Sequence, residues 1–148
     1  MTLIGDWQAA LATEQQAGFG YDLLGARLHG TPELSLAVVC SNAHDALIGS
    51  VTEQLATAGQ TPHPTAADYP SLYPVDNASA ARALAIRLET ECAAAWRYLY
   101  ENAASTTGAQ AITLRAQAQA ALTASAVRAT RWRLAAATKP LTTAFPGL

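Results

Sequence analysis

Residues 60–76 read QTPHPTAADYPSLYPVD, and this stretch decides how the chain can fold. It holds four of the seven prolines in the 148-residue chain, so it is not a helix. Its 17 residues exceed the roughly 2–8 residues usual between neighbouring helices. Fully extended, they reach up to about 56 Å, whereas a 25-residue helix is about 38 Å long. The stretch therefore predicts a segment that travels the full length of a helical domain, held to its surface by Tyr69, Leu72 and Tyr73.

The sequence on both sides of this crossover has the composition and spacing of long helices. Alanine, the best helix former, supplies 35 of the 148 residues. Apolar residues recur at three- and four-residue spacing, which is typical of helices that bury one face. We expect helices at about 6–28, 32–58, 77–102 and 108–138 within a single domain over residues 1–148, with the crossover at 60–76.

The ends of these helices carry recognisable signals. Asp6, Thr31 and the 76–77 pair are N-cap candidates. Thr107 with Gln110 three residues later is a possible capping box. The last eight residues, 141–148, include Phe145 and are expected to dock on the bundle.

Two short-looped hairpins joined by one long crossover predict an all-α, ferritin-like four-helix bundle. This connectivity differs from simple up-down-up-down bundles, in which every connection is short. It requires the second and third helices to be parallel. Antiparallel helices joined locally at one end would contradict it.

Several charged residues fall in stripes that should face the core. Glu14 lies in the first-helix stripe and His44 in the second-helix stripe. In the third helix, Glu91 follows the stripe of Leu84 and Leu88, and Glu89 lies on a neighbouring stripe, so both remain candidates. A buried carboxylate needs a partner. The fourth helix offers four: Arg115, Arg128, Arg131 and Arg133.

Five stretches carry a likeness to a known family. They are EQQAGFGYDLLGARL at 14–28, AHDAL at 43–47, RLETE at 87–91, RATRWR at 128–133 and AFPGL at 144–148. Together they resemble an uncharacterised actinobacterial family of alanine-rich ferritin-like domains. The resemblance implies a ferritin-like fold, and it brings no established substrate.

The resemblance also raises the question of a metal site. Ferritin-like di-iron proteins take a Glu from each of two helices and a Glu-x-x-His pair from each of the other two. Glu14 matches the first-helix Glu, and either Glu89, which the RLETE likeness favours, or Glu91 matches the third-helix Glu. His44 matches one histidine, but Ser41 stands three residues before it, and the fourth helix has no Asp, Glu or His. A complete di-metal site is therefore not expected within one chain.

We interpret these residues as a structural cluster or vestigial metal site, built from Glu14, His44, Glu89 or Glu91, and Arg115 or Arg128. An arginine where the family has a metal-binding pair would neutralise the same carboxylates. We expect no catalytic residue and no cofactor, and therefore a structural or binding protein rather than an enzyme. The alternative is an iron- or manganese-dependent oxidoreductase or iron-handling protein with Glu14, His44 and Glu89 as metal ligands.

Charge distribution gives a second alternative. The net charge is −2, yet residues 1–101 carry all 11 acidic and four basic residues, while residues 102–148 carry five basic residues and no acidic one. A basic fourth helix is compatible with nucleic-acid binding. We prefer the interpretation that it packs on three acidic helices, because the pI is near 5.8.

The remaining features of the sequence concern the location of the protein and its partners. Two cysteines without CxxC spacing predict buried reduced thiols. The N-terminal segment carries Asp6 and Glu14 and lacks the basic start of a signal peptide. We expect a cytoplasmic protein with no membrane span. Alanine-rich faces and Tyr98 and Tyr100 favour a homodimer, and the sequence identifies no protein or small-molecule partner.

Overall fold

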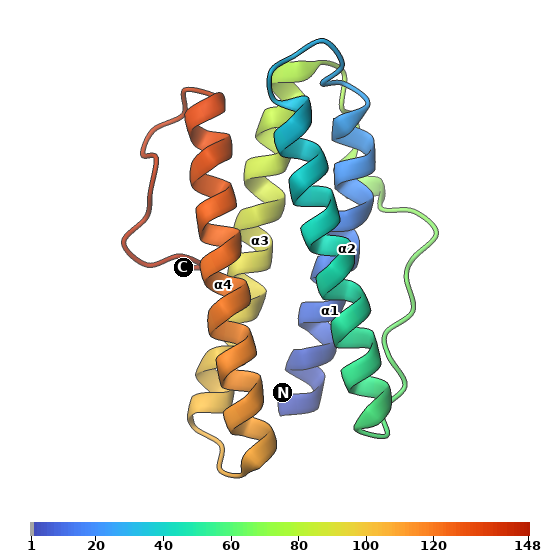
Figure 1. The fold of residues 1–148 in the computed structure, drawn as a ribbon, viewed down its shortest axis with the longest axis vertical. Coiled ribbons are helices and arrows are strands. Elements are labelled where there is room, and N and C mark those ends of the chain that lie inside the picture. Colours follow the sequence, from blue (N-terminus) through green and yellow to red (C-terminus); the bar gives the residue numbers. More distant parts are fainter. Residues whose placement is uncertain (1) are drawn as a thin grey trace.

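Four α-helices form a bundle in residues 2–148, which the computed structural model describes, and this part of the chain contains no strand (Figure 1). The helices are α1 (Leu3–Gly25), α2 (Leu34–Thr57), α3 (Ala78–Ala104) and α4 (Ala109–Ala135). A short 3₁₀ turn, η1 (Pro70–Leu72), lies within the crossover. The predicted all-α four-helix bundle is confirmed.

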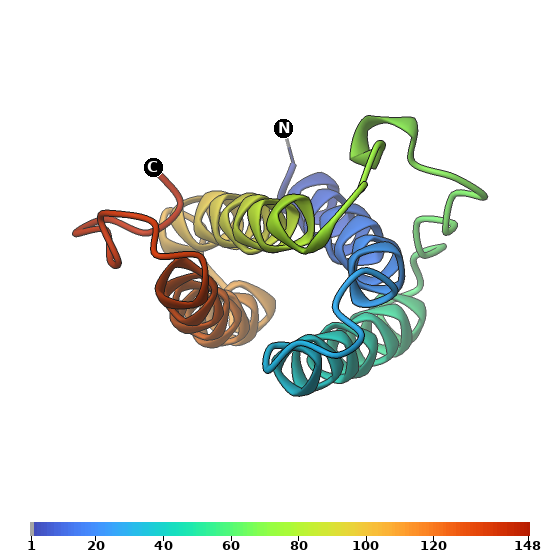
Figure 2. The same ribbon diagram turned by 90° about the horizontal axis from the view of Figure 1, so that it is seen from above.

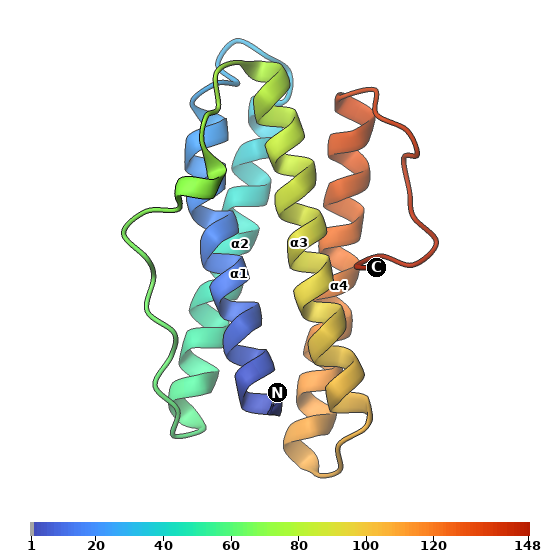
Figure 3. The same cartoon turned by 180° about the vertical axis from the view of Figure 1, so that it is seen from behind.

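The crossover runs along the outside of the bundle from the end of α2 to the start of α3 (Figures 1 and 3). The second and third helices are consequently parallel, as predicted. Leu72 is buried, and the ring of Tyr69 packs on Phe19 with centroids 5.2 Å apart. Tyr73, expected to help hold the segment, is instead 49% exposed, because η1 turns Leu72 inward and Tyr73 outward.

Two glutamines of α1 fasten the first half of the crossover. Gln8 Nε2 donates to the Thr61 carbonyl at 2.7 Å, and Gln8 Oε1 accepts from the His63 backbone N–H at 2.7 Å. Gln15 Nε2 donates to the His63 carbonyl at 2.8 Å. Side-chain amides thus supply the hydrogen bonds that this non-helical backbone cannot make to itself.

Helix α1 begins earlier than predicted. Thr2, and not Asp6, is its N-cap, and the Thr2 side chain accepts from the Gly5 backbone N–H at 3.0 Å. Asp6 lies inside the first turn, where it is buried and accepts from Asn102 Nδ2 at 2.7 Å. Asp6 therefore ties α1 to the end of α3.

Two other predicted N-caps are also wrong. Thr31 donates to the Leu28 carbonyl at 2.8 Å and does not cap α2, which begins only at Leu34. The N-cap of α4 is Gly108 and not Thr107. Gly108 has a φ of 111°, a backbone conformation that glycine adopts readily, and the helix begins directly after it. The predicted cap of α3 is confirmed, since the Asn77 side chain accepts from the backbone N–H three residues on.

Seen along its axis, the bundle is an arc in the order α2, α1, α3, α4 (Figure 2). Glycines bring neighbouring helices close at mid-length. A Cβ on Gly20 would lie 2.5 Å from Leu88 Cδ1, and one on Gly18 would lie 3.3 Å from Ile48 Cδ1. This close approach of α1 to α3 and α2 brings short polar side chains within reach of one another in the core.

Helix α2 is an edge of this arc, packed mainly on α1. Its length and composition are sufficient to cross a membrane, yet only 22% of its most apolar window is buried. Val38 and Val39 are more than half exposed. A single helix that meets these criteria of length and composition is weak evidence for a membrane span.

The C-terminal segment folds back beside α3 and α4 (Figure 1). Gly147 makes its closest approach, since a Cβ there would lie 2.7 Å from the Ala93 carbonyl oxygen. Its φ of 84° also suits glycine. Phe145 is 71% exposed, so the segment docks through Gly147 and not through the aromatic ring we expected.

Candidate functional site

Three charged side chains from three helices meet at the centre of the bundle. His44 of α2 lies between two carboxylates, with Nδ1 2.5 Å from Glu14 Oε2 of α1 and Nε2 3.0 Å from Glu89 Oε1 of α3. All three side chains are fully buried. One imidazole ring therefore joins three helices.

Helix α4 completes this arrangement with Arg128. Its Nε lies 3.0 Å from Oε1 and 2.9 Å from Oε2 of Glu89, and its Nη2 donates to Ser125 Oγ at 3.1 Å. We call Glu14, His44, Glu89 and Arg128 the central cluster. Each of the four helices contributes one charged member to it.

Aromatic donors take up the remaining acceptor positions. Trp96 Nε1 donates to Glu14 Oε1 at 2.7 Å, and the Tyr21 hydroxyl donates to Glu89 Oε1 at 2.6 Å. Trp132 Nε1 in turn donates to the Tyr21 hydroxyl oxygen at 2.8 Å. Every carboxylate oxygen of the central cluster consequently accepts at least one hydrogen bond, as buried charges require.

The geometry determines the protonation of His44. Both ring nitrogens face carboxylate oxygens, and both can donate only in the imidazolium form. Burial alone would lower the pKa of His44, but the hydrogen bonds and charges of Glu14 and Glu89 outweigh it and raise this pKa to about 9. His44 and Arg128 then balance the two carboxylates, so the central cluster is neutral as a whole.

The pKa of Glu14 shifts in the opposite direction to that of His44. Burial would raise its pKa, but the hydrogen bonds from His44 and Trp96 and the positive charges of His44 and Arg128 lower it below the usual value. Burial also depresses the pKa of Arg128, which its contact with Glu89 more than restores. The ionised forms are therefore the stable ones in this interior.

Other titratable groups beside the central cluster stay neutral. Burial and the Glu89 charge raise the pKa of Tyr21 well above its usual value. Burial, followed by the charges of Glu14 and Glu89, does the same for the thiol of Cys92, whose Sγ lies 3.9 Å from the Thr13 carbonyl. No thiolate or phenolate is available here at neutral pH.

Four of the six residues singled out in the sequence come together in the central cluster, and two do not. Glu91 is only partly buried and pairs with Arg87 one turn away at 2.9 Å, while Gln16 donates to its other oxygen. Arg115 lies on α4 outside the central cluster and makes no salt bridge within residues 2–148. Glu89 faces the core because it lies in the fully buried stripe of Ala85, Cys92 and Trp96, whereas Glu91 meets Gln16 at the exposed border between α1 and α3.

Sequence reasoning missed the aromatic donors. Tyr21, Trp96 and Trp132 are not among the candidate residues that the apolar stripes and charges of the sequence single out. A signal was present: Tyr21 follows Glu14 by two helical turns, and Trp96 follows Glu89 by two turns, so each lies on the face of a buried acid. Tyr and Trp usually find a hydrogen-bond partner when buried.

The donor set fits poorly with a metal. Glu14, His44 and Cys92 offer ligand atoms within 4.8 Å of one another. However, both His44 nitrogens carry protons towards carboxylates, and the raised pKa of Cys92 keeps its thiol protonated. Arg128 also places a positive charge on Glu89. A cation here would have to displace a proton and lie close to that guanidinium.

Helix register relates the central cluster to di-iron sites. In α4, Ser125 and Arg128 stand three residues apart, both pointing inward, and Ser41 and His44 stand three apart in α2. These are the spacings of the two Glu-x-x-His pairs of ferritin-like proteins. Of the four residues those pairs would require, only His44 is present.

Comparisons with known proteins place the chain as follows. A family model described as a domain of unknown function, DUF4439, matches residues 7–148. The fold is similar to the crystal structure of a conserved hypothetical protein, rv2844, from Mycobacterium tuberculosis, with a TM-score of 0.79 and 31% sequence identity. The match covers 90% of this chain and 96% of that one. No curated protein matches.

Proposed function

We propose that this chain, which belongs to the DUF4439 family, is a non-catalytic ferritin-like bundle in which an ion-pair cluster stands where related bundles hold metal. Its role would be structural or binding. The connectivity of two hairpins and one long crossover supports the ferritin-like assignment. The three-residue spacing of Ser41 and His44 in α2 and of Ser125 and Arg128 in α4 supports the derivation from a metal site.

One observation carries the proposal: Arg128 bonds both oxygens of Glu89, and His44 bonds both acids. A metal site presents carboxylate oxygens towards an open position, whereas here each carboxylate oxygen already accepts at least one hydrogen bond. The buried charges stabilise one another and join all four helices. This is the arrangement of a structural core and not of a reaction centre.

Elemental analysis of protein purified without added metal or chelator tests the proposal. We expect well under one iron or manganese per chain and no oxidation of added ferrous iron. Stoichiometric iron or manganese bound by Glu14, His44 and a third ligand would favour the alternative, a metal-dependent oxidoreductase or iron-handling protein.

A gain-of-metal variant tests the ferritin-like derivation separately. Ser41→Glu, Ser125→Glu and Arg128→His together restore both Glu-x-x-His pairs. If the backbone register descends from a di-metal site, the folded triple variant binds two ferrous or manganous ions per chain, while the parent binds none. A folded triple variant that binds no metal would contradict the derivation. Circular dichroism establishes whether it is folded.

We also propose that two copies associate through the exposed edge of the bundle formed by α2 and α4. Val38 and Val39 on α2 and Val127 and Leu134 on α4 are exposed apolar residues. Charge supports pairing of α2 with the partner's α4, because α2 carries two acidic and no basic residues and α4 carries four arginines and no acid. In such a dimer the arginines of α4 would face the partner's α2, and few of them would remain free to bind nucleic acid.

Light scattering after gel filtration measures this association. Val39→Lys should convert the dimer to a monomer by adding a positive charge opposite the arginines of α4. Tyr73→Lys is the matched control, since Tyr73 is similarly exposed but lies on the crossover. A parent protein that is monomeric at micromolar concentration would refute the dimer.

We also propose a cytoplasmic location. The two free, buried cysteines are consistent with it, because thiols stay reduced in that compartment.

A further inference from the structure

An indole N–H without a partner marks the end of the bundle where α1 begins. Trp7 is 4% exposed, and its Nε1 is buried with no hydrogen bond to any of residues 2–148. The other two indoles, Trp96 and Trp132, both donate in the core. An unpaired buried donor typically costs about 1–3 kcal/mol. The Trp7 N–H is therefore poised for an acceptor supplied from outside the chain.

Trp7 lines a cavity of about 380 Å³ between the first turns of α1, the last turns of α2 and the first turns of α4. The volume lies within the roughly 300–1,000 Å³ usual for ligand pockets. Leu114, Ala58 and the indole supply apolar wall, and Glu53 is the only charged residue of the lining. We call this the end cavity.

A second unpaired group lies beside the end cavity. Gln54 lines it, and Gln54 Oε1 accepts from Gln117 Nε2 at 2.7 Å. The other amide atom of that partner, Gln117 Oε1, is buried and has no hydrogen-bond partner within residues 2–148. Asp6 Oδ1 is likewise buried without a partner within residues 2–148, but of these three residues only Trp7 lines the end cavity. A ligand in the end cavity can accept from the indole N–H of Trp7 and donate to Glu53, the one carboxylate of the lining.

We propose that the end cavity binds a small neutral planar heterocycle with a C=O next to an N–H, such as a pyrimidine base. The indole of Trp7 and Leu114 supply apolar wall for the ring. The C=O accepts from Trp7 Nε1, and the N–H donates to the Glu53 carboxylate. The lining holds no Lys or Arg and one carboxylate, which disfavours phosphates and carboxylates as ligands.

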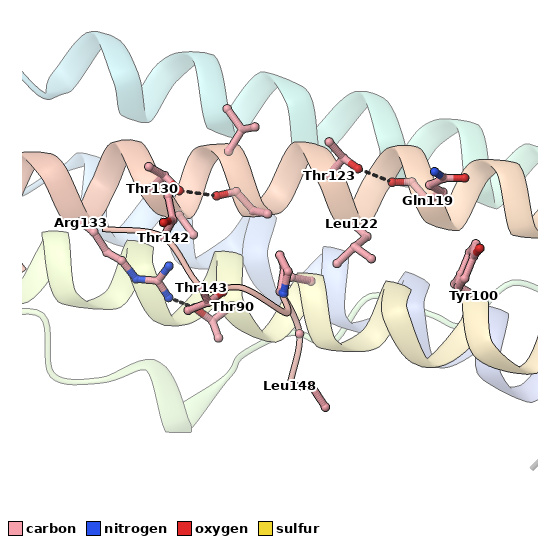
Figure 4. A pocket seen from close by; sticks show the side chains of 16 residues that line it. Thr90, Tyr100, Gln119, Leu122, Thr123, Thr130, Arg133, Thr142, Thr143 and Leu148 are labelled. Carbon is pink, nitrogen blue, oxygen red and sulfur yellow. Dashed lines mark hydrogen bonds between the residues drawn. The ribbon is translucent and has the colours of Figure 1, made fainter. Parts of the chain in front are cut away.

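A larger cavity of about 620 Å³ between α3, α4 and the C-terminal segment lacks this signature (Figure 4). The Thr123 and Thr130 hydroxyls donate to carbonyls of their own helix, and Arg133 Nη2 donates to Thr90 Oγ1 at 3.4 Å (Figure 4). None of the buried unpaired atoms of residues 2–148 belongs to its lining. The end cavity is therefore the better candidate, although it is smaller.

The three tryptophans provide a direct test by nuclear magnetic resonance. Each indole N–H of ¹⁵N-labelled protein gives one signal, and Trp7→Phe identifies that of Trp7. Millimolar uracil should move the Trp7 signal saturably and leave Trp96 and Trp132 unchanged, because those two N–H groups already donate in the core. In 1,3-dimethyluracil the ring N–H groups are blocked, so we expect at least tenfold weaker binding.

Two variants locate the binding. Ala58→Phe fills the end cavity and should abolish the uracil response, whereas Ala126→Phe enters the larger cavity and should leave it intact. The proposal is overturned if uracil leaves the Trp7 signal unmoved, if dimethyluracil binds equally well, or if glucose moves the signal and uracil does not. Should either variant fail to fold, the two titrations of the parent protein decide by themselves.

Discussion

At the centre of the bundle, four charged side chains pair with one another, whereas at the end where α1 begins, three buried polar atoms have no hydrogen-bond partner within residues 2–148. The central cluster takes one charged residue from each helix, and each carboxylate oxygen accepts a donor. These atoms are Asp6 Oδ1, Trp7 Nε1 and Gln117 Oε1, and of the three residues only Trp7 lines the end cavity. The difference is that hydrogen bonds within the chain satisfy the buried charges of the centre, whereas they leave polar atoms at this end unpaired.

The largest expected loss of stability comes from a substitution in the central cluster. Glu89→Gln removes one of two buried negative charges and leaves Arg128 and His44 facing a neutral amide. Disrupting a buried pair from one side costs about 3–5 kcal/mol. We expect the free energy of unfolding, measured by urea denaturation at pH 7, to fall by that amount.

Glu91→Gln is the matched control for this prediction. Glu91 lies two residues along the same helix, where its pair with Arg87 is about 40% exposed. Exposed pairs are worth at most about 1 kcal/mol, so this variant should keep nearly the parental midpoint. Equal effects of the two substitutions would show that the buried location of Glu89 has no energetic weight.

The second prediction concerns pH. The pKa of His44 is about 9 in the folded protein and 6.5 in its reference state, so the native state binds its proton more tightly. The resulting stabilisation is complete below pH 6.5 and is lost as pH rises through 9. A shift of this size corresponds to about 3 kcal/mol. Glu14, whose pKa is lowered, contributes in the opposite sense, with stability lost as pH falls below 4.5.

Urea denaturation between pH 4 and pH 10 measures both limbs. We expect maximal stability at about pH 5–6.5 and a decline of about 3 kcal/mol by pH 10. His44→Gln should remove the part of the alkaline limb between pH 6.5 and 9 and leave the part above about pH 9, where the thiols of Cys40 and Cys92 ionise in the unfolded chain but burial raises their pKa in the folded one. An alkaline limb that is unchanged in this variant would place its origin outside the central cluster.

The smallest expected effect is the difference in stability between two tryptophan variants, one in each region. Trp96→Phe and Trp7→Phe remove the same atoms from buried positions, but only Trp96 donates a hydrogen bond, to Glu14 Oε1. We expect Trp96→Phe to destabilise the protein by about 1–3 kcal/mol more than Trp7→Phe. Equal losses measured by thermal denaturation would mean that Trp7 is satisfied in the unliganded protein.

The fold followed from the sequence because its signals are periodic and local. The proline-rich 60–76 stretch and the alanine-rich helices around it required a long crossover and two hairpins. Helix starts were harder to predict. A threonine or aspartate signals a cap only if the backbone enters the helix there, and Gly108 with its φ of 111° moved that point for α4. Asp6, which resembles a cap in the sequence, instead bonds to Asn102 in another helix.

The candidate site was only partly predictable for a related reason. Glu14 and His44 stand out as polar residues in apolar stripes, which one helix suffices to reveal. The choice of Glu89 over Glu91 depends on how α3 is rotated in the bundle, and the choice of Arg128 among four arginines depends on how α4 is rotated. The spacing of apolar residues does not predict either rotation, because alanine occurs on several faces of these helices.

The charge of His44 at neutral pH is the property on which this account rests most directly. Nitrogen-15 spectra of the imidazole, recorded from pH 5 to 11 before and after adding ferrous or manganous ions, measure it. We expect both ring nitrogens to remain protonated at pH 7, to titrate near pH 9 and to be unaffected by either metal. A neutral ring at pH 7 that titrates below pH 6.5, or a signal lost on adding one equivalent of metal, would contradict the ion-pair cluster and restore a metal centre.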